Sequence, residues 1–341
     1  MTPVSRIPIE PVSMLREGFG LIQNQRPENM TGFITAEEDL FAVWHLGIPD
    51  VPLDEWTLQL TGMVDRPLTV TLQDLKSMPQ TEIVSVHECA GSPLQPSIAQ
   101  RRVGNVRWGG VRLSDVLELA GPFPDADYVI SAGCDRGVYD ASFHDHYEKD
   151  LPLDKATDGN VLLALTINGA PLSVGRGGPV RLVVPGYYGT NSTKWLTTLT
   201  VSDARSPRAF TTRYYMDPPQ DRTGEPTPVW DLAPNSCIVG PIDGDVHTGQ
   251  STEVWGWAWA GSEPVTTVEV STDGGLSWDQ AQVRGRRRNE WQHFSYLWDP
   301  PSVGEYILAS RSTTPSGATQ PLTPRRNQIH QRLIFVTQQT L

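Results

Sequence analysis

Cysteine is scarce in this chain of 341 residues, which contains only Cys89, Cys134 and Cys237. Their number is odd, their spacing is long and no C-x-x-C pair occurs, so neither a disulfide framework nor a four-cysteine zinc site is predicted. The sequence also has no signal-like apolar segment at its start and no run of about 18 apolar residues. We therefore expect free thiols and a soluble, cytoplasmic protein that has no membrane partner, unless a leader has been removed.

Positive charge is in deficit, because 27 lysines and arginines stand against 39 acidic residues and the formal net charge is −12. Such a chain has no broad positive field to attract a phosphate backbone, and we expect no nucleic-acid partner. The 30 glycines and 29 prolines are too many for a helical bundle or a coiled coil. This composition favours strands and turns.

The length predicts two domains, and the local patterns divide the chain in the same way. Residues 1–50 are rich in proline and weakly periodic, which indicates an N-terminal arm. Strand-like and short helical patterns alternate irregularly over 51–235 and predict an α+β domain. Residues 236–341, after a proline-rich stretch, show the period-two alternation of an all-β sandwich.

The common catalytic signatures are absent: we find no G-x-S-x-G, no G-x-x-x-x-G-K-[ST], no G-x-G-x-x-G and no H-E-x-x-H. Cys89 remains a candidate because it ends a strand-like run in VHECAGS, where the chain leaves a sheet. A thiolate there serves as a nucleophile or as a ligand for a soft metal, and a buried structural thiol is the alternative. His144 and His146 in SFHDHYEKD indicate either a metal pair or a solvated polar loop.

Four segments carry a family resemblance. They are CAGS after a strand, GNVRWGGVRLSDVLELAG, INGAPLSVGRGGPVRLVVPGYYGTNSTKWLTTLTV and WGWAWAGSEPVTTVEVSTDGGLSWDQA. In this order, over about residues 40–335, they resemble the sulfite oxidase family of molybdenum-cofactor oxidoreductases. The resemblance implies an α+β molybdopterin-binding domain followed by an all-β immunoglobulin-like sandwich domain that pairs two subunits into a homodimer.

The resemblance also implies a metal site. Cys89 looks like the single cysteine whose sulfur binds molybdenum, while the pterin dithiolene supplies the other sulfurs. Tyr215 in RYYMD matches a tyrosine that the family keeps beside the metal, and it is a candidate hydrogen-bond or proton donor. A loop with Asp135, Arg136 and Tyr139 corresponds to one that lies near the metal in the family.

Basic residues are expected to hold the anionic pterin phosphate of the molybdenum cofactor. His45, Arg181 and Lys194 correspond to the family's pterin-binding positions. Arg176 stands in GRGGPVR where the family usually has a histidine, and we expect it to serve the same phosphate. The chain has no haem-binding stretch and no C-x-x-C-H, so we expect no haem and an external electron acceptor or dioxygen.

The chain departs from the family where sulfite should bind. Val43 in FAVWH stands where the family has an arginine, residues 92–94 read Ser-Pro-Leu in place of N-R-R, and Trp255 replaces the arginine before G-x-A-W. Each missing arginine forfeits about 1.5–3 kcal/mol of charged hydrogen bonding to an oxyanion. We therefore predict a substrate pocket with Val43, Trp44 and Trp255 that accepts a neutral or aromatic organic substrate rather than sulfite.

Several alternatives remain open at this point. Cations relocated to other loops, such as Arg101, Arg102 and Arg107, would restore a sulfite dehydrogenase or oxidase. Trp44 and Trp255 pack a domain interface in the plainer interpretation. A cofactor-binding or adaptor protein without redox turnover and a thiol hydrolase that uses Cys89 are the remaining alternatives.

Overall fold

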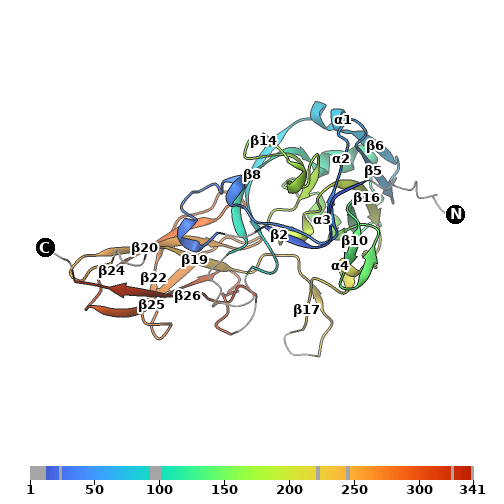
Figure 1. The fold of residues 1–341 in the computed structure, drawn as a ribbon. Helices are drawn as coiled ribbons and strands as arrows, with labels where there is room; N and C mark the ends of the chain where they lie inside the picture. Colours follow the sequence, from blue (N-terminus) through green and yellow to red (C-terminus); the bar gives the residue numbers. More distant parts are fainter. Residues whose placement is uncertain are drawn as a thin grey trace.

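The structure, a computed structural model, describes residues 13–22, 25–92, 101–219, 223–242, 246–323 and 326–338. A rounded lobe of strands and short helices is followed along the chain by an elongated lobe of strands alone (Figure 1). This architecture confirms the predicted order of an α+β domain and an all-β domain.

The first domain contains two five-stranded sheets. One has the order β12 (Glu148–Pro152), β9 (Tyr128–Gly133), β16 (Leu196–Ser202), β5 (Thr57–Gly62) and β6 (Leu68–Thr71), in which only β16 and β5 are parallel. The other has the order β14 (Ala170–Pro171), β13 (Leu162–Ile167), β8 (Val103–Arg112) and β7 (Thr81–Glu88), with β15 (Arg181–Val183) also paired to β13. Strands β7 and β15 bring residues of the candidate site to this second sheet.

Short helices and turns connect these strands. They are α1 (Leu72–Ser77), α2 (Leu113–Ala120), α3 (Leu153–Ala156), α4 (Ala209–Thr212), η3 (Val174–Arg176) and η4 (Gly189–Asn191). Helix α1 begins with a capping box, because the Thr71 hydroxyl accepts the Asp74 N–H at 3.1 Å and the Asp74 carboxylate accepts the Thr71 N–H at 2.8 Å. Gly121 ends α2 in the left-handed conformation, with φ of 68°. Two small hairpins are formed by β10 (Gly137–Tyr139) with β11 (Ser142–His144) and by β17 (Met216–Asp217) with β18 (Thr227–Pro228).

The N-terminal arm adds strands to the first domain instead of hanging free. Strand β1 (Met14–Glu17) pairs with β4 (Gly47–Pro49), and β2 (Gly20–Ile22) pairs with β3 (Ala42–Trp44); η1 (Pro27–Asn29) and η2 (Glu37–Asp39) lie between β2 and β3. The arm also reaches the second domain, since Trp257 Nε1 donates to the Met30 carbonyl at 2.7 Å. Residues 1–12 of the predicted arm lie outside the described residues.

The second domain is a sandwich of two four-stranded antiparallel sheets. One sheet has the order β19 (Asn235–Gly240), β20 (Thr252–Trp259), β24 (Gln292–Trp298) and β23 (Gln282–Val283); the other has β22 (Asp279–Gln280), β21 (Thr267–Ser271), β25 (Gly304–Thr313) and β26 (Gln331–Val336). Val254, Phe294, Leu308 and Ile334 are fully buried between them. Burial of alternate residues from two facing sheets is what stabilises such a sandwich.

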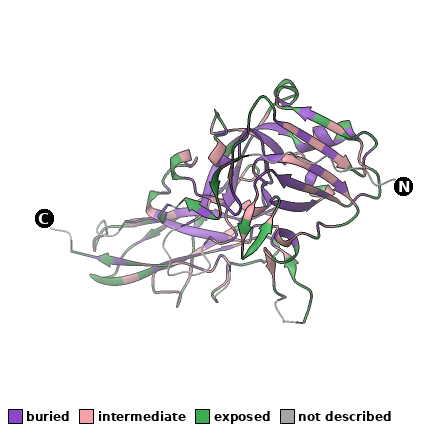
Figure 2. Ribbon diagram, turned by 45° about the vertical axis from the view of Figure 1, so that its right-hand side comes forward, coloured by how far each residue is buried: buried purple, intermediate pink, exposed green. Residues whose placement is uncertain are grey.

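An aromatic-rich interface joins the two domains. Trp257 stacks on Trp291 at 4.8 Å between ring centroids, and both pack in one buried cluster with Val86, Ala90 and Tyr188 of the first domain. Figure 2 shows buried residues continuing from the first domain into the sandwich. No helix in the described parts of the chain is long and apolar enough to cross a membrane.

Candidate functional site

A cavity lies in the first domain where β3, the end of β7 and the segment from η3 to Trp195 meet. The cavity is lined by Leu40, Phe41, Ala42, Val43, Trp44, His45, His87, Cys89, Asp135, Tyr147, Gly175, Arg176, Arg181, Gly189, Thr190, Ser192, Lys194, Trp195 and Tyr215. Of the residues predicted to bind the metal, the pterin or the substrate, all except Trp255 line the cavity. Of the loop predicted to lie near the metal, Asp135 lines it, whereas Arg136 and Tyr139 do not.

Cys89 is the first residue after β7. Its N–H donates to the Arg102 carbonyl at 2.8 Å, and the Gly91 N–H donates to its Sγ at 3.4 Å. Burial raises the pKa of the Cys89 thiol, although the Gly91 N–H and the Arg102 guanidinium oppose the shift. No described histidine hydrogen-bonds to this sulfur. The site therefore lacks the activating base that a nucleophilic cysteine needs, which argues against the thiol hydrolase.

Three basic side chains form one wall of the cavity. Lys194 is half-buried, but its Nζ is buried and has no hydrogen-bond partner; the Nζ lies 4.6 Å from the Trp195 ring centroid. Arg181 donates to the carbonyls of Arg176 and Ser192 at 3.0 and 3.2 Å, while its Nε has no partner. Burial, and then the repulsion of Arg181, lowers the pKa of Lys194 to about 7. Buried N–H groups of cations are costly to leave without hydrogen-bond partners. The unpartnered Lys194 Nζ and Arg181 Nε therefore indicate that this wall binds an anion.

Arg176 differs from these two residues. Its Nη1 donates to the Phe41 carbonyl at 2.8 Å, and its Nη2 donates to the carbonyls of Leu40, at 2.9 Å, and Glu37. Its Nε lies 3.5 Å from the Glu37 carboxylate. The Arg176 guanidinium therefore holds the backbone before β3 in place, which we had not expected, and it has fewer N–H groups left for a phosphate.

His45 and Tyr215 form a close pair. His45 Nε2 lies 2.5 Å from the Tyr215 hydroxyl, and the imidazole stacks on Tyr147 at 5.3 Å between ring centroids. Burial and the nearby Lys194 lower the pKa of His45 to about 3, so the ring is neutral at physiological pH. His45 was predicted to hold the pterin phosphate, but its Nε2 already has the Tyr215 hydroxyl as a partner inside the protein. Tyr215 has a φ of 54°, a strained conformation for a tyrosine and one that is typical of functional sites.

Two further residues line the cavity: Asp135, which was expected only as part of a loop near the metal, and Tyr147, which was not predicted. Asp135 is buried, its Oδ1 has no partner, and burial raises its pKa to about 7. The Tyr147 hydroxyl contacts Thr190 at 2.7 Å. Sequence patterns give no signal for Tyr147, because its role depends on contacts that form only in the fold.

The three residues predicted to form the substrate pocket do not all lie at the cavity. Val43 and Trp44 line the cavity, and Trp44 is buried with its Nε1 unpartnered. Trp255 does not line it, and this part of the prediction needs correction. The alternation of β20 puts Trp255 on the same face as Trp257 and Trp259, where it packs against the buried cluster that joins the two domains and stacks on His293 at 5.5 Å between ring centroids, as the interface interpretation predicted.

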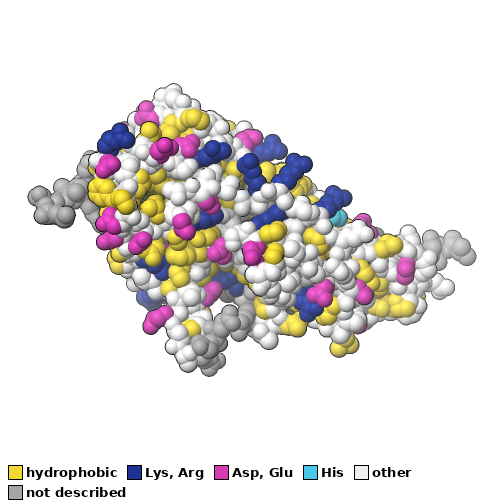
Figure 3. Space-filling view, turned by 180° about the vertical axis from the view of Figure 1, so that it is seen from behind, with side chains coloured by type: hydrophobic (Ala, Val, Ile, Leu, Met, Phe, Trp, Pro, Cys, Tyr) yellow, Lys and Arg dark blue, Asp and Glu magenta, His cyan; other side chains and the backbone are white. Residues whose placement is uncertain are grey.

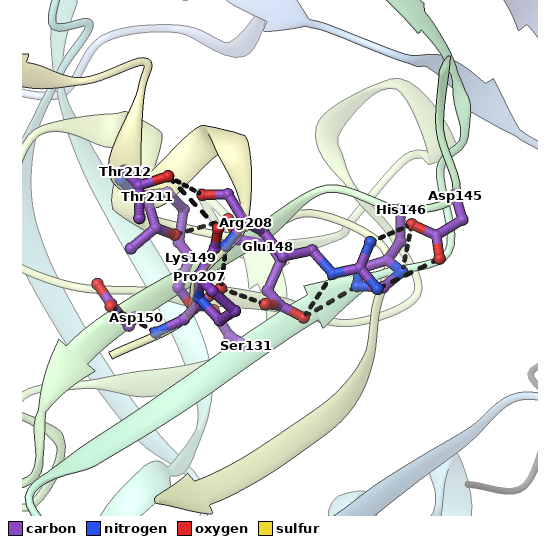
Figure 4. A network of polar contacts seen from close by, with 11 residues as sticks. Ser131, Asp145, His146, Glu148, Lys149, Asp150, Pro207, Arg208, Thr211 and Thr212 are labelled. Atoms are coloured by element: carbon purple, nitrogen blue, oxygen red, sulfur yellow. Dashed lines mark hydrogen bonds and ion pairs between the residues drawn. The ribbon is translucent and has the colours of Figure 1, made fainter. Parts of the chain in front are cut away.

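The two histidines of SFHDHYEKD do not form a metal pair. His146 lies 2.9 Å from Glu148 and 3.3 Å from Asp145, and Arg208 pairs with Asp145 at 2.5 Å (Figure 4). His144 packs on Phe210 at 5.0 Å. Among the described residues, no group of three or more His, Cys, Asp or Glu side chains is arranged to hold a metal ion. The structure therefore supports the polar-loop interpretation over the metal pair, with His146 held in a network of ion pairs.

Comparisons with known proteins match this order of domains. The family model "Oxidoreductase molybdopterin binding domain" matches residues 45–210, and "Mo-co oxidoreductase dimerisation domain" matches residues 227–302. Together they define a molybdopterin-binding oxidoreductase.

Two relatives and one solved structure narrow the family. The chain is 32% identical to mouse mitochondrial sulfite oxidase, over 77% of this chain and 52% of that protein, and 30% identical to chicken sulfite oxidase, over 85% and 68%. The structure of the sulfane dehydrogenase SoxCD from Paracoccus pantotrophus superposes with a TM-score of 0.79 and 26% identity, covering 97% of this chain and 86% of that one. The chain belongs to the sulfite oxidase family, as its motifs predicted. It spans about half the length of the mammalian relatives that it matches.

Proposed function

We propose that this protein is a molybdenum-cofactor-dependent oxidoreductase in which Cys89 is the protein ligand of the metal. The observation that carries the proposal is the cavity itself, which joins a single cysteine sulfur to the buried and unpartnered Lys194 Nζ and Arg181 Nε. When bound, the cofactor supplies a metal that changes oxidation state as an oxygen atom is transferred. Electrons then pass to an external acceptor or to dioxygen.

The residues of the cavity fit such a group. A pterin phosphate offers acceptors to Lys194 and Arg181, and it removes the cost of leaving their N–H groups unpaired. Trp44 Nε1 is a further buried donor without a partner. Metal analysis of the purified protein tests this fit, because a chain with neither molybdenum nor pterin would favour the adaptor alternative.

Tyr215 is the candidate donor beside the metal ligand. Burial, and then the nearby Cys89, raises the pKa of the Tyr215 phenol, so the hydroxyl keeps its proton. The neutral His45 ring, 2.5 Å away, holds the orientation of this hydroxyl. Tyr215 can therefore donate a hydrogen bond to an oxygen atom that enters the cavity.

For the substrate we propose a neutral or aromatic organic molecule, or an organic sulfur or nitrogen compound, in preference to sulfite. Val43, where the family places an arginine, contributes an apolar side chain to the cavity wall beside Phe41 and Trp44. Residues 93 and 94 of the second departure lie outside the described residues. The structural relative SoxCD is a sulfane dehydrogenase, which supports a substrate other than sulfite on this fold.

Sulfite oxidation with relocated cations is the second candidate, and one observation favours it. Arg102 Nη1 donates to the Gly91 carbonyl at 3.2 Å, and its guanidinium opposes the rise that burial causes in the pKa of Cys89. Arg107 is exposed on β8, five residues farther along the chain. Arg102 is thus the relocated cation that the geometry supports.

Val43→Arg distinguishes these substrates. We expect little sulfite turnover by the wild-type protein with ferricyanide as acceptor. The added guanidinium should lower the KM for sulfite by about tenfold, the effect of one charged hydrogen bond, and should slow turnover of apolar substrates. Val43→Leu is the matched control and should leave the KM for sulfite unchanged. Rapid wild-type turnover at micromolar sulfite would instead establish the second candidate.

The homodimer is also proposed, with the outer face of β25 and β26 as its contact. Ile307, Leu333 and Phe335 are 40%, 48% and 42% exposed there, and the dimerisation family model matches the preceding part of this domain. Leu333→Glu should weaken dimerisation by roughly 100-fold, as measured by sedimentation, because it places a charge in an apolar interface. Leu276→Glu, at an 89% exposed turn, is the control. A Leu333→Glu protein that stays as dimeric as the wild type would exclude this face.

A further inference from the structure

We infer that the second domain positions Cys89, and that Arg326 is the positioning residue through which it does so. The contacts that support this inference lie at the junction of the two domains, near β8 and β19 (Figure 1). The inference rests on the proposed function only for its consequence in catalysis, since the contacts themselves involve the protein alone.

Arg326 reaches from the second domain into the first. Its Nη1 donates to the carbonyl of Ala90, the residue after Cys89, and its Nη2 pairs with Asp217 at 2.6 Å. The guanidinium lies over the Tyr188 ring, 5.1 Å from the centroid. One side chain, only 19% exposed, therefore ties the Cys89 loop to β17, which begins immediately after Tyr215.

The residue before Cys89 is also bound to the second domain. Glu88 is fully buried; its Oε1 accepts Asn235 Nδ2 and its Oε2 accepts Trp259 Nε1, both at 2.8 Å. Asn235 is itself held by Gln320, whose Nε2 donates to Asn235 Oδ1 at 2.9 Å. Both chain neighbours of Cys89 thus hydrogen-bond to side chains of the sandwich.

These contacts add to the hydrogen bonds that the first domain gives the loop. Within the described residues, the Cys89 N–H donates to the Arg102 carbonyl, the Cys89 carbonyl accepts the Ser92 N–H at 3.0 Å, and Arg102 Nη1 donates to the Gly91 carbonyl at 3.2 Å. A metal ligand must be held to within about 0.5 Å by the groups around it. Hydrogen bonds donated by a charged group, such as the Arg326 guanidinium, are strong enough to do this. The sandwich is therefore part of the site as well as the proposed dimer contact.

Figure 3 shows basic side chains along the rim where the two domains meet. One arginine of the second domain is a matched control for Arg326. Arg332 Nη1 also donates to a backbone carbonyl, that of Val239, at 3.0 Å, but both residues lie within the second domain. Arg332→Met therefore loses the same charge and a similar bond without touching the Cys89 loop.

The test is the rate at which iodoacetamide alkylates Cys89 in the full chain after its cofactor is removed, followed by peptide mass spectrometry. Arg326→Met should accelerate alkylation of Cys89 by about tenfold, the effect of losing a charged hydrogen bond, while the buried Cys134 serves as the internal reference. Arg332→Met should react like the wild type, and Arg326→Lys, which keeps a donor for Ala90, should recover much of the protection.

Equal rates for Arg326→Met and wild type would overturn the inference. If Arg326→Met does not fold, Asp217→Asn replaces it, since it releases the far end of the guanidinium; a rate that does not rise would again contradict the inference. In the loaded full chain, Arg326→Met should shift the visible absorption and Arg332→Met should not. Failure of the alkylation result leaves the metal-ligand role of Cys89 intact, because that role is tested separately by metal content.

Discussion

Cys89→Ser should yield a folded chain that contains almost no molybdenum. A serine oxygen is a harder and far more basic donor than a thiolate, and it does not replace a sulfur ligand to a soft metal. Substitution of a residue that only hydrogen-bonds to a metal ligand already lowers metal affinity or activity by about 10–100-fold. Because Cys89 is the proposed ligand itself, we expect its substitution to lower both metal content and oxidative activity by more than about 100-fold. Elemental analysis and visible absorption measure the first, and turnover with an artificial acceptor measures the second.

Cys134→Ser is the control for this variant. Cys134 is buried in the core of the same domain and does not line the cavity, so its substitution should reduce stability while the metal content stays at the wild-type level. A Cys89→Ser protein that keeps its visible absorption and its activity would refute the metal-ligand role. Rapid labelling of Cys89 by iodoacetamide in the loaded wild-type protein would do the same, since a metal-bound thiolate resists alkylation.

Lys194→Met should have opposite effects on the empty and the loaded protein. Burial and the neighbouring Arg181 lower the pKa of Lys194 to about 7, so the unfolded chain binds more protons than the folded chain between about pH 7 and pH 10.5. Below this pH window the buried charge lowers the free energy of unfolding by its full amount, and above the window this destabilisation disappears. Methionine removes the charge, and the cofactor-free variant should be more stable than the wild type by about 4 kcal/mol near pH 6.

In the loaded protein the sign reverses, because the phosphate then loses a charged partner. Retention of the cofactor during dialysis should fall by about tenfold or more. Lys76→Met, at the exposed end of α1, should change neither quantity. The stability difference between Lys194→Met and the wild type should vanish near pH 10; a difference that does not depend on pH would show that the lysine is not strained by its burial.

Local patterns predicted the parts of this molecule that depend on local sequence. The strand that ends at Cys89, the α+β order and the family motifs around Arg181 and Lys194 were readable in this way. What could not be predicted depends on contacts between distant segments. The His45–Tyr215 pair joins residues 170 positions apart, and the Arg326–Ala90 bond joins residues 236 positions apart.

The error at Trp255 has the same origin. Aligned motifs indicated which residue replaces the family's arginine, but whether its side chain lines the cavity or packs against the cluster between the domains depends on the fold. Arg176 was assigned to a phosphate by its charge, whereas the carbonyls before β3 take up most of its donors. Electron acceptor, haem content and cellular location stay predictions.

The span of the site along the chain has a consequence for biosynthesis. The cavity wall begins at Leu40, whereas the groups that grip the Cys89 loop include Trp259 and Arg326. Domains generally fold in order as they leave the ribosome. We therefore expect the Cys89 loop, which lies in the early-made half of the molecule, to be held in place only after nearly the whole polypeptide has emerged, and the proposed cofactor to enter at the end of maturation.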